Sequence, residues 1–278
     1  MTVQPSQRRA RGRPRTTPEA QAPTVQALDR AINLLSTLAR DGRATLSELA
    51  EKVDMPASSA HRLLTTMQAH ALVEFGETSQ DWTIGVEAFR IGSAFVQRGN
   101  LVDLSREVMR ALVDDTGETA NLAIPDEGEV VFLSQVDTQN PIRAFFRPGT
   151  RVHMHSSGIG KALLAEFDRR VVEQILNRRG MPGWTEKTLT TANALFADLE
   201  TTRARGYSFD DEERHTGMRC IAAPVFNAYG EAVAGISISG PTGRISTEAV
   251  ERLGGRVREA AAEVTEITGG TPPQRDAR

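Results

Sequence analysis

The chain has 278 residues, of which 39% are hydrophobic, and it carries a formal net charge of −3 and a single cysteine. This length is enough for two domains with separate cores, and one cysteine excludes a disulfide within the chain and is typical of a reducing compartment. No apolar run is long enough to span a bilayer, and the Arg-rich start lacks the apolar stretch of a secretory signal, so we expect a soluble cytoplasmic protein.

Residues 1–23 are predicted to be a disordered basic arm. They contain five arginines against one acid, are rich in Pro, Gln, Ser and Thr, and show no apolar periodicity. Arg11, Arg13 and Arg15 alternate here with Gly12 and Pro14, and this segment resembles the AT-hook, which lies along a narrow A·T-rich minor groove. A generic basic tail that binds phosphate loosely is the alternative interpretation. Either arm would place positive charge beside a DNA-binding element.

Residues 24–85 show the pattern of three helices followed by a β-hairpin, which is a winged helix-turn-helix domain. Thr24 is expected to cap the first helix, and Asp41-Gly42 to stop it. Thr45 and Glu48 have the spacing of a capping box at the start of the second helix. The two hairpin strands are predicted over Leu72–Phe75 and Asp81–Ile84.

The third helix follows Pro56 and is the candidate DNA-reading element. Its apolar residues recur at helical spacing and must face a core, which leaves short polar side chains and one long cation outside. These candidate DNA-binding residues are Ser58, Ser59, His61, Arg62 and Thr65. A helix carrying such groups can lie in a major groove, although a small helical bundle with a polar outer face shows the same spacing. Residues 24–99 contain seven Lys/Arg against nine Asp/Glu, so the cations for DNA binding are expected from the arm.

The rest of the chain predicts a linker helix and an α+β domain. The linker helix is expected over residues 86–99, the second domain over 100–269 and a disordered tail over 270–278, with the domain boundary at Gly99-Asn100. A sheet with helices before, within and after it is typical of an α+β sensor-like domain. The expected strands are Thr119–Ile124, Val130–Asp137, Ile142–Arg147, Arg151–His155, Tyr207–Asp210, Arg219–Asn227 and Ala232–Ser239. The expected helices are Leu101–Thr116, Ser156–Phe167, Arg169–Arg179, Ala192–Arg205 and Ser246–Thr268, the last one frayed at Gly254-Gly255.

Six strings occur in one order along the chain: Pro56–Leu64, Trp82–Gly85, Ser157–Ala165, Arg205–Glu213, Gly217–Val225 and Gly235–Gly240. Together they resemble the IclR family of bacterial transcription regulators over roughly residues 24–269. The resemblance implies an N-terminal winged helix, a linker helix and a C-terminal effector-binding domain of the GAF/profilin-like kind. It also implies homodimers through the DNA-binding half, and commonly homotetramers built as dimers of dimers. Within the family, SFDDEE, GMRCIAAPVF and ISISGP are most similar to the glyoxylate-responsive regulators of isocitrate lyase and of the β-hydroxyaspartate cycle.

A small oxo-acid needs donors for its carboxylate and a polar partner for its carbonyl, inside an otherwise apolar cup. Gly158 and Ile159 belong to a Gly-rich stretch that opens a helix, where backbone amides favour an anion. Ser237 and Ser239 alternate on a strand, so their hydroxyls point to the same side of the sheet.

The resemblance places two further polar residues in the pocket. Asp210 would accept a hydrogen bond from the hydrated aldehyde, and Cys220 would pack beside it. The apolar wall would be formed by Met218, Val152 and Ala144. Ordinary structural roles remain the alternative for each residue, such as tight helix packing for the glycines, an inert buried thiol, or an ion pair between Asp210 and an arginine.

The alternative function is a cysteine-dependent enzyme that acts on a small aldehyde acid, with Cys220 as the nucleophile. An activated cysteine needs a base or cation to stabilise its thiolate, but Arg219 faces the opposite side of the strand and His215 falls in a loop. His153 and His155 are a conceivable metal pair without further ligands, so structural roles are favoured. We therefore expect a regulator rather than an enzyme, with no metal or cofactor. Its expected partners are an operator in double-stranded DNA, a small-molecule effector and copies of itself, and no membrane.

Overall fold

The computed structural model describes residues 25–96 and 100–273, which divide into two compact units between Ala94 and Phe95. The predicted basic arm with Arg11, Arg13 and Arg15 lies outside the described residues, as do Gly99 and the end of the predicted tail. Among the residues described, no helix combines the length and the apolar character needed to cross a membrane.

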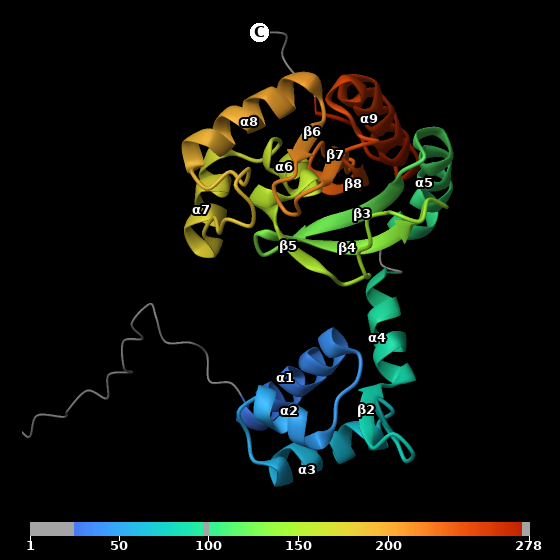
Figure 1. The fold of residues 1–278 in the computed structure, drawn as a ribbon, viewed down its shortest axis with the longest axis vertical. Coiled ribbons are helices and arrows are strands. Elements are labelled where there is room, and N and C mark those ends of the chain that lie inside the picture. The colour runs from blue at the N-terminus through green and yellow to red at the C-terminus, as the bar shows by residue number, and fades with distance from the viewer. Residues whose placement is uncertain (1–24, 97–99, 274–278) are drawn as a thin grey trace, which may run out of the picture. The chain divides into compact units, whose positions relative to one another are not determined.

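The first unit contains three helices, a two-stranded sheet and most of a fourth helix (Figure 1). Its elements are α1 (Gln26–Asp41), α2 (Leu46–Lys52), α3 (Ala57–Ala69), β1 (Val73–Gly76) and β2 (Asp81–Ile84), followed by α4 (Val86–Val96). The capping box is present, because the Thr45 amide donates to the Glu48 carboxylate at 2.8 Å and the Glu48 amide donates back to Thr45 Oγ1 at 3.4 Å. The prediction of Thr24 as a cap is wrong. Helix α1 begins at Gln26 with Val25 at its N-cap and no side-chain cap, and Thr24 lies outside the described residues.

One apolar core holds this unit together. Leu34, Leu38, Leu49 and Leu64 are fully buried, and Trp82 of β2 packs into the same cluster from the hairpin. The hairpin is antiparallel. Its first strand starts one residue later than predicted because the amide of residue 72 still donates to a carbonyl of α3, closing the end of that helix.

The second unit is a six-stranded antiparallel sheet with helices on both faces, which confirms the predicted α+β class. The strand order is β5-β4-β3-β8-β7-β6. Its strands are β3 (Thr119–Asp126), β4 (Glu129–Val136), β5 (Arg151–His153), β6 (Ser208–Asp211), β7 (Met218–Phe226) and β8 (Ala232–Pro241). Its helices are α5 (Leu101–Thr116), η1 (Met154–Ser156), α6 (Gly158–Leu164), α7 (Arg169–Arg179), α8 (Ala192–Arg205), η2 (Thr247–Ala249) and α9 (Val250–Ile267).

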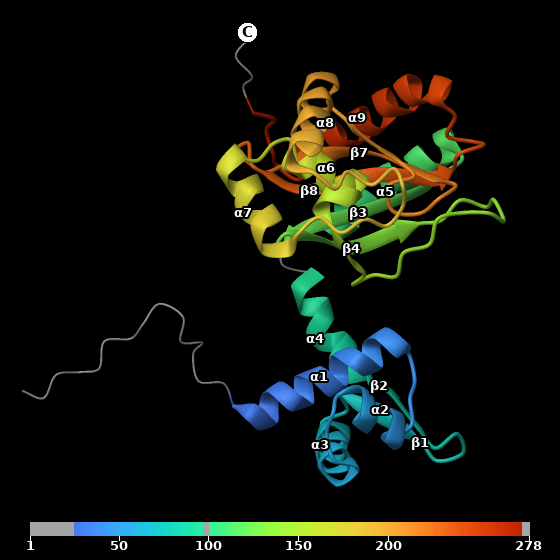
Figure 2. The same cartoon turned by 60° about the vertical axis from the view of Figure 1, so that its left-hand side comes forward.

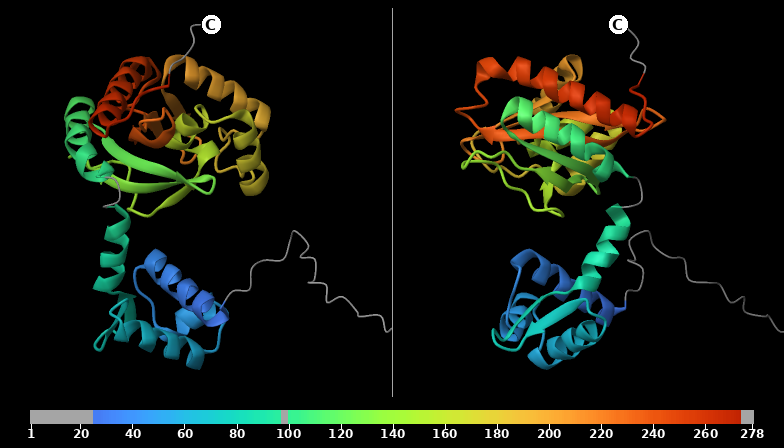
Figure 3. Two further views of the ribbon diagram at one scale, coloured as in Figure 1. Left: turned by 180° about the vertical axis from the view of Figure 1, so that it is seen from behind. Right: turned by 90° about the vertical axis from the view of Figure 1, so that its right-hand side faces the viewer.

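Two hydrophobic cores lie on opposite faces of this sheet. Helices α5 and α9 lie side by side on one face (Figure 3) and enclose residues such as Met109, Ile221 and Val257. On the other face α6 packs against β7 and β8 (Figures 1 and 2), and its core includes Ile159 and Ala222. The central strands β3, β7 and β8 therefore contribute alternate side chains to two separate cores.

The structure differs from several predictions for the second unit. Residues 142–147 form no strand, because the amide of Phe146 bonds to the side chain of Gln135 at 2.7 Å instead of joining the ladder. Helix α6 is shorter than Ser156–Phe167, since Ser157 caps it after the 3₁₀ turn η1. Helix α9 does not fray at its two glycines. It starts after a 3₁₀ turn and continues through them.

Gly254→Ala is expected to lower the free energy of unfolding by about 1–3 kcal/mol, because a Cβ at this position would meet the buried ring of Tyr207. The nearest ring atom would lie at 2.4 Å. The matched control is Gly255→Ala on the same helix, where a Cβ meets nothing within 4 Å. That substitution is expected to stabilise by about 0.5–1 kcal/mol through helix propensity. Urea unfolding of the full chain measures both, and equal effects would contradict the close helix–ring contact.

Candidate functional site

Strand alternation separates the site from the core on β7 and β8. Ile236 and Ile238 belong to the core beneath α5 and α9, whereas Ser237 and Ser239 face the α6 side. On β7, Cys220 lies opposite Ser239 in the ladder. The pairing brings a thiol and two hydroxyls together on one face of the sheet.

These side chains border a cavity of about 210 Å³. All nine residues predicted for the effector pocket line it: Ala144, Val152, Gly158, Ile159, Asp210, Met218, Cys220, Ser237 and Ser239. The structure adds side chains that the sequence did not single out for this site: Phe132, Arg143, Phe145, Phe146, Ser156, Ser157, Arg214, His215 and Arg219. The cavity is therefore apolar on one side, where Phe132 and Phe146 stack with ring centroids 4.3 Å apart, and polar around Asp210.

Two hydroxyl groups of the cavity lack an oxygen or nitrogen hydrogen-bond partner in the described part of the chain. Ser156 and Ser237 are almost completely buried, and their Oγ atoms have no oxygen or nitrogen partner among the described residues, although Ser237 lies beside the Cys220 thiol. Ser239 differs, because it accepts a hydrogen bond from Asn121 Nδ2 at 3.3 Å. Buried polar groups in proteins are nearly always satisfied, so unpartnered hydroxyls at a cavity indicate a polar ligand or water.

Gly158 fixes how closely α6 approaches β7. A Cβ at this position would lie 2.6 Å from Cys220 Sγ, so only glycine permits the observed packing. The Gly158 carbonyl accepts a hydrogen bond from Ser208 Oγ of β6 at 2.6 Å. The start of α6 is thereby fixed against two strands.

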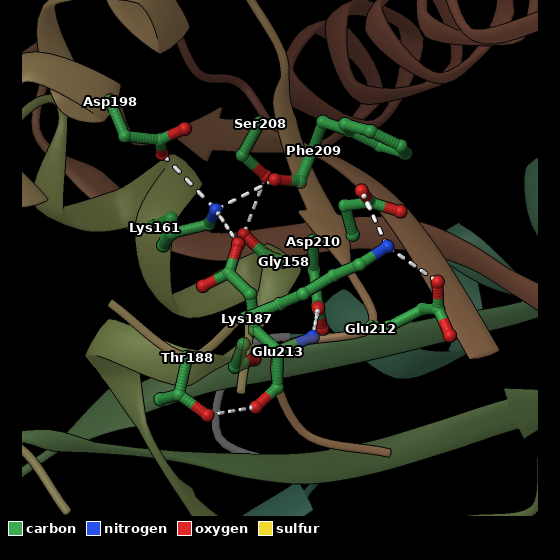
Figure 4. A network of polar contacts seen from close by, with 12 residues as sticks. Gly158, Lys161, Lys187, Thr188, Asp198, Ser208, Phe209, Asp210, Glu212 and Glu213 are labelled. Atoms are coloured by element: carbon green, nitrogen blue, oxygen red, sulfur yellow. Dashed lines mark hydrogen bonds and ion pairs between the residues drawn. The ribbon is translucent and has the colours of Figure 1, made fainter. Parts of the chain in front are cut away.

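Behind the cavity lies a cluster of buried charges centred on Lys161 of α6 (Figure 4). Its ammonium group is fully buried, donates to the Phe209 carbonyl at 2.6 Å and to the Glu213 carboxylate, and pairs with Asp198 of α8 at 3.1 Å. The Asp210 carboxylate lies next to this cluster and accepts a hydrogen bond from the Glu213 amide at 2.8 Å. One cation therefore connects α6, β6, α8 and the loop after β6.

The cluster contains more carboxyl groups than cations, and this shifts its pKa values. Burial raises the pKa of Asp210 to about 6 and that of Glu213 to about 7. The nearby ammonium group of Lys161 lowers both pKa values but only partly offsets the effect of burial. Burial alone would lower the pKa of Lys161, but the charges of Glu213 and Asp198 outweigh it and the pKa is raised. Lys161 is therefore charged, and the carboxyl groups of Asp210 and Glu213 titrate near neutral pH.

Cys220 lacks the activation that a nucleophile needs. Burial raises the pKa of its thiol to about 12, and the negative charge of Asp210 acts in the same direction. The thiol therefore stays protonated at neutral pH, which disfavours the cysteine-dependent enzyme.

The two histidines of the conceivable metal pair have other contacts. The His155 ring nitrogen lies 3.1 Å from the Pro182 carbonyl, and the His153 ring packs against Trp184 with centroids 5.8 Å apart. In the described part of the chain, no group of three or more His, Cys, Asp or Glu residues is placed to hold a metal ion.

The predicted DNA-binding residues lie on α3. Ser58, His61, Arg62 and Thr65 are exposed, and Ser59 is half-buried. The Thr65 hydroxyl donates to the His61 carbonyl of its own helix at 2.9 Å, so toward DNA it offers only an acceptor. Arg62 is the long cation of this face.

Residues 27–76 match the family described as the IclR helix-turn-helix domain, and residues 93–266 match the one described as bacterial transcriptional regulator IclR C-terminal. The chain belongs to the IclR family. It is 47% identical over 253 residues to the HTH-type transcriptional regulator BhcR of Paracoccus denitrificans, covering 91% of this chain and 90% of that one. It is 42% identical over 250 residues to the transcriptional repressor IclR of Escherichia coli, covering 88% and 91%.

The structure agrees with this assignment. The crystal structure of the Thermotoga maritima IclR matches with a TM-score of 0.73 and 28% identity, over 88% of this chain and 99% of that one. The predicted fold, with an N-terminal helix-turn-helix domain and a C-terminal GAF/profilin-like domain, is confirmed. This IclR-family chain is a DNA-binding transcriptional regulator and not an enzyme.

Sequence reasoning missed the charges behind and beside the cavity. Lys161 lies in the run GIGKALLA, where a lysine flanked by small and apolar residues is a visible signal of a buried cation. Arg214 lines the cavity, and its guanidinium carbon lies 3.8 Å from the centre of the Trp184 ring. Nothing in the sequence predicts this second contact, because the two residues are far apart in the chain.

Asp210→Asn is expected to reduce the loss of stability as pH rises. The folded-state pKa of about 6 exceeds the ordinary value of 3.8, so the folded protein binds this proton more tightly than the unfolded chain does. The contribution of Asp210 to stability therefore falls as pH rises from about 4 to about 6 and stays low above that range. Asparagine keeps the acceptor for the Glu213 amide but cannot ionise.

Urea unfolding at about pH 5 and about pH 7.5 measures this effect. The free energy of unfolding of Asp210→Asn, relative to that of the natural protein, should be higher at the higher pH. The control Asp103→Asn, at an exposed aspartate, should show no such increase. A constant difference between the natural protein and Asp210→Asn would contradict the raised pKa of this buried carboxyl.

Proposed function

We propose that this regulator binds a small oxo-acid, glyoxylate, in the cavity between α6 and the sheet, and that binding changes its affinity for operator DNA. The observation that carries the proposal is the pair of buried, unpartnered hydroxyls of Ser156 and Ser237 at a cavity that also contains Asp210. Hydroxyl donors suit a carboxylate or a hydrated carbonyl, and Asp210 suits the hydroxyls of a hydrated aldehyde. The strings SFDDEE, GMRCIAAPVF and ISISGP support glyoxylate within this class.

In the proposed site, Gly158 and Ile159 lie at the start of α6, and Ser239 and Cys220 line the cavity beside them. Met218, Val152 and Ala144 supply apolar contacts around the ligand. The volume of about 210 Å³ admits a small acid with few carbon atoms and excludes a polymeric ligand.

For DNA, we propose that α3 enters the major groove with Ser58, Ser59, His61, Arg62 and Thr65 toward the duplex. The arm with Arg11, Arg13 and Arg15 would add contacts to the minor groove or the phosphates. The regulator would act in the cytoplasm, where bacterial DNA lies.

We also propose that the first unit forms a homodimer, and that dimers associate further into tetramers. Large apolar side chains are exposed on two of its helices: Val25, Leu28 and Ile32 around α1, and Val86, Phe89 and Ile91 on α4. Phe89 is 75% exposed, which is costly in water and favours a covered state. A two-fold dimer would present two copies of α3 to the two half-sites of an operator.

Arg62→Ala is expected to cost about 1–3 kcal/mol of DNA-binding free energy, because the side chain is the long cation on the exposed face of α3. The affinity for DNA is measured at fixed salt by fluorescence anisotropy of a labelled fragment from upstream of the protein's own gene. Arg110→Ala serves as the control, since Arg110 is an exposed arginine of α5 paired with Glu107. If Arg62→Ala binds DNA as tightly as the natural protein, α3 is not the helix that reads the DNA.

Glyoxylate should shift the anisotropy titration of the natural protein, and acetate should not, because acetate has no aldehyde group whose hydrate could donate hydrogen bonds to Asp210. Asp210→Ala should bind DNA normally yet no longer respond to glyoxylate. A specific complex that ignores glyoxylate would exclude it as the effector and direct the search to pyruvate and glycolate. Loss of both DNA and effector binding in Asp210→Ala would contradict the separation of functions between the two domains.

A further inference from the structure

One arginine at the cavity has a buried donor that is not used within the described part of the chain. Arg214 lines the cavity, and its Nη1 is buried without a hydrogen-bond partner among the described residues. Its guanidinium group lies over the ring of Trp184, with 3.8 Å between the guanidinium carbon and the ring centre. Stacking on an aromatic face orients the guanidinium plane but consumes none of its N–H donors. The group is thus held in place with a free donor.

The other arginines at the cavity are engaged with protein acceptors. Arg219 donates to Asp211 at 2.6 Å and to the Ile245 carbonyl at 2.8 Å. Arg143 lies 3.6 Å from the Asp137 carboxylate. Each of these two cations already has a carboxylate partner, so neither is as free for a ligand as Arg214.

The backbone that carries Arg214 is held firmly. The preceding residue, Glu213, is bound through its carboxylate to Lys161, through its amide to Asp210, and through its carbonyl to Thr188 Oγ1 at 2.6 Å (Figure 4). Arg214 therefore projects from a fixed point beside Asp210, with little freedom to leave the cavity.

An acid that enters this cavity meets the carboxylate of Asp210 in an apolar environment. Two negative charges brought together away from water repel each other strongly unless a cation lies close by. Lys161 is already surrounded by Glu213, Asp198 and the Phe209 carbonyl and does not line the cavity. The countercharge must come from the cavity wall.

We propose that Arg214 binds the carboxylate of the effector and is the specificity-determining residue that makes this cavity select an acid over a neutral aldehyde. The proposal rests on the proposed function, because it assigns a role within the same site. Trp184 is a positioning residue, since its ring keeps the guanidinium over the cavity instead of in solvent.

Calorimetric titration of the full-length protein tests this inference, with glyoxylate, pyruvate and oxalate as acids and glycolaldehyde as the neutral aldehyde. Arg214→Gln should weaken binding of the acids about 10- to 100-fold, the loss expected for one charge-assisted hydrogen-bonding group. Binding of glycolaldehyde should change little. Arg214→Lys should recover part of the acid affinity, because it restores the charge without the planar fork.

A matched control excludes a general effect of losing an arginine. Arg110→Gln removes an exposed arginine of α5 and should leave acid binding unchanged. Ligand-dependent tryptophan fluorescence provides a second readout. An acid bound by Arg214 should alter the emission of Trp184, and the change should disappear in Trp184→Phe although binding persists.

The outcomes separate the two proposals. If the natural protein and Arg214→Gln bind an acid equally, the role of Arg214 is overturned while the effector site stands. If Arg214→Gln weakens glycolaldehyde as much as glyoxylate, Arg214 shapes the cavity and does not select charge. If none of the acids binds the natural protein, both the proposed function and this inference fail.

Discussion

The buried ammonium group of Lys161 is the interaction on which the effector domain depends. It lies in α6, yet its partners come from β6, from α8 and from the loop after β6, so a single charge connects segments that are distant in sequence (Figure 4). Removing one partner of a buried ion pair typically costs about 3–5 kcal/mol, because the remaining charge stays buried and unpaired. The same cluster positions Asp210 at the cavity and keeps its carboxyl group close to titration at neutral pH.

Strand β8 contributes side chains to a hydrophobic core on one face of the sheet and to the cavity on the other face. On β8 the isoleucines enter the core beneath α5 and α9, and the serines between them face α6. Glycine at position 158 lets α6 approach β7 until its backbone contacts Cys220. Close packing of α6 therefore both closes the second core and forms the floor of the cavity.

Local signals in the sequence predicted much of this fold, because they act within a few residues. Helices α5 and α8 were predicted at their observed bounds, since glycines 117 and 206 adopt the left-handed conformation that ends a helix. The capping box at Thr45 was likewise visible. The sequence wrongly predicts a strand over residues 142–147, because no local signal shows that the amide of Phe146 bonds to the side chain of Gln135 on β4.

The candidate site was predicted in part for the same reason. Strand alternation placed Ser237 and Ser239 together, and the family resemblance supplied Asp210 and Cys220. The buried charge of Lys161 and the stacking of Arg214 on Trp184 depend on contacts between distant segments, which no local pattern encodes.

We propose that this one chain couples an acid-binding cavity to a DNA-reading helix. Thermodynamic linkage requires that coupling to be reciprocal. The most direct measurement is the affinity of the full-length protein for glyoxylate with and without saturating operator DNA. We expect operator DNA to change glyoxylate affinity by the same factor by which glyoxylate changes operator affinity. Glyoxylate affinity that is the same with and without operator would contradict it.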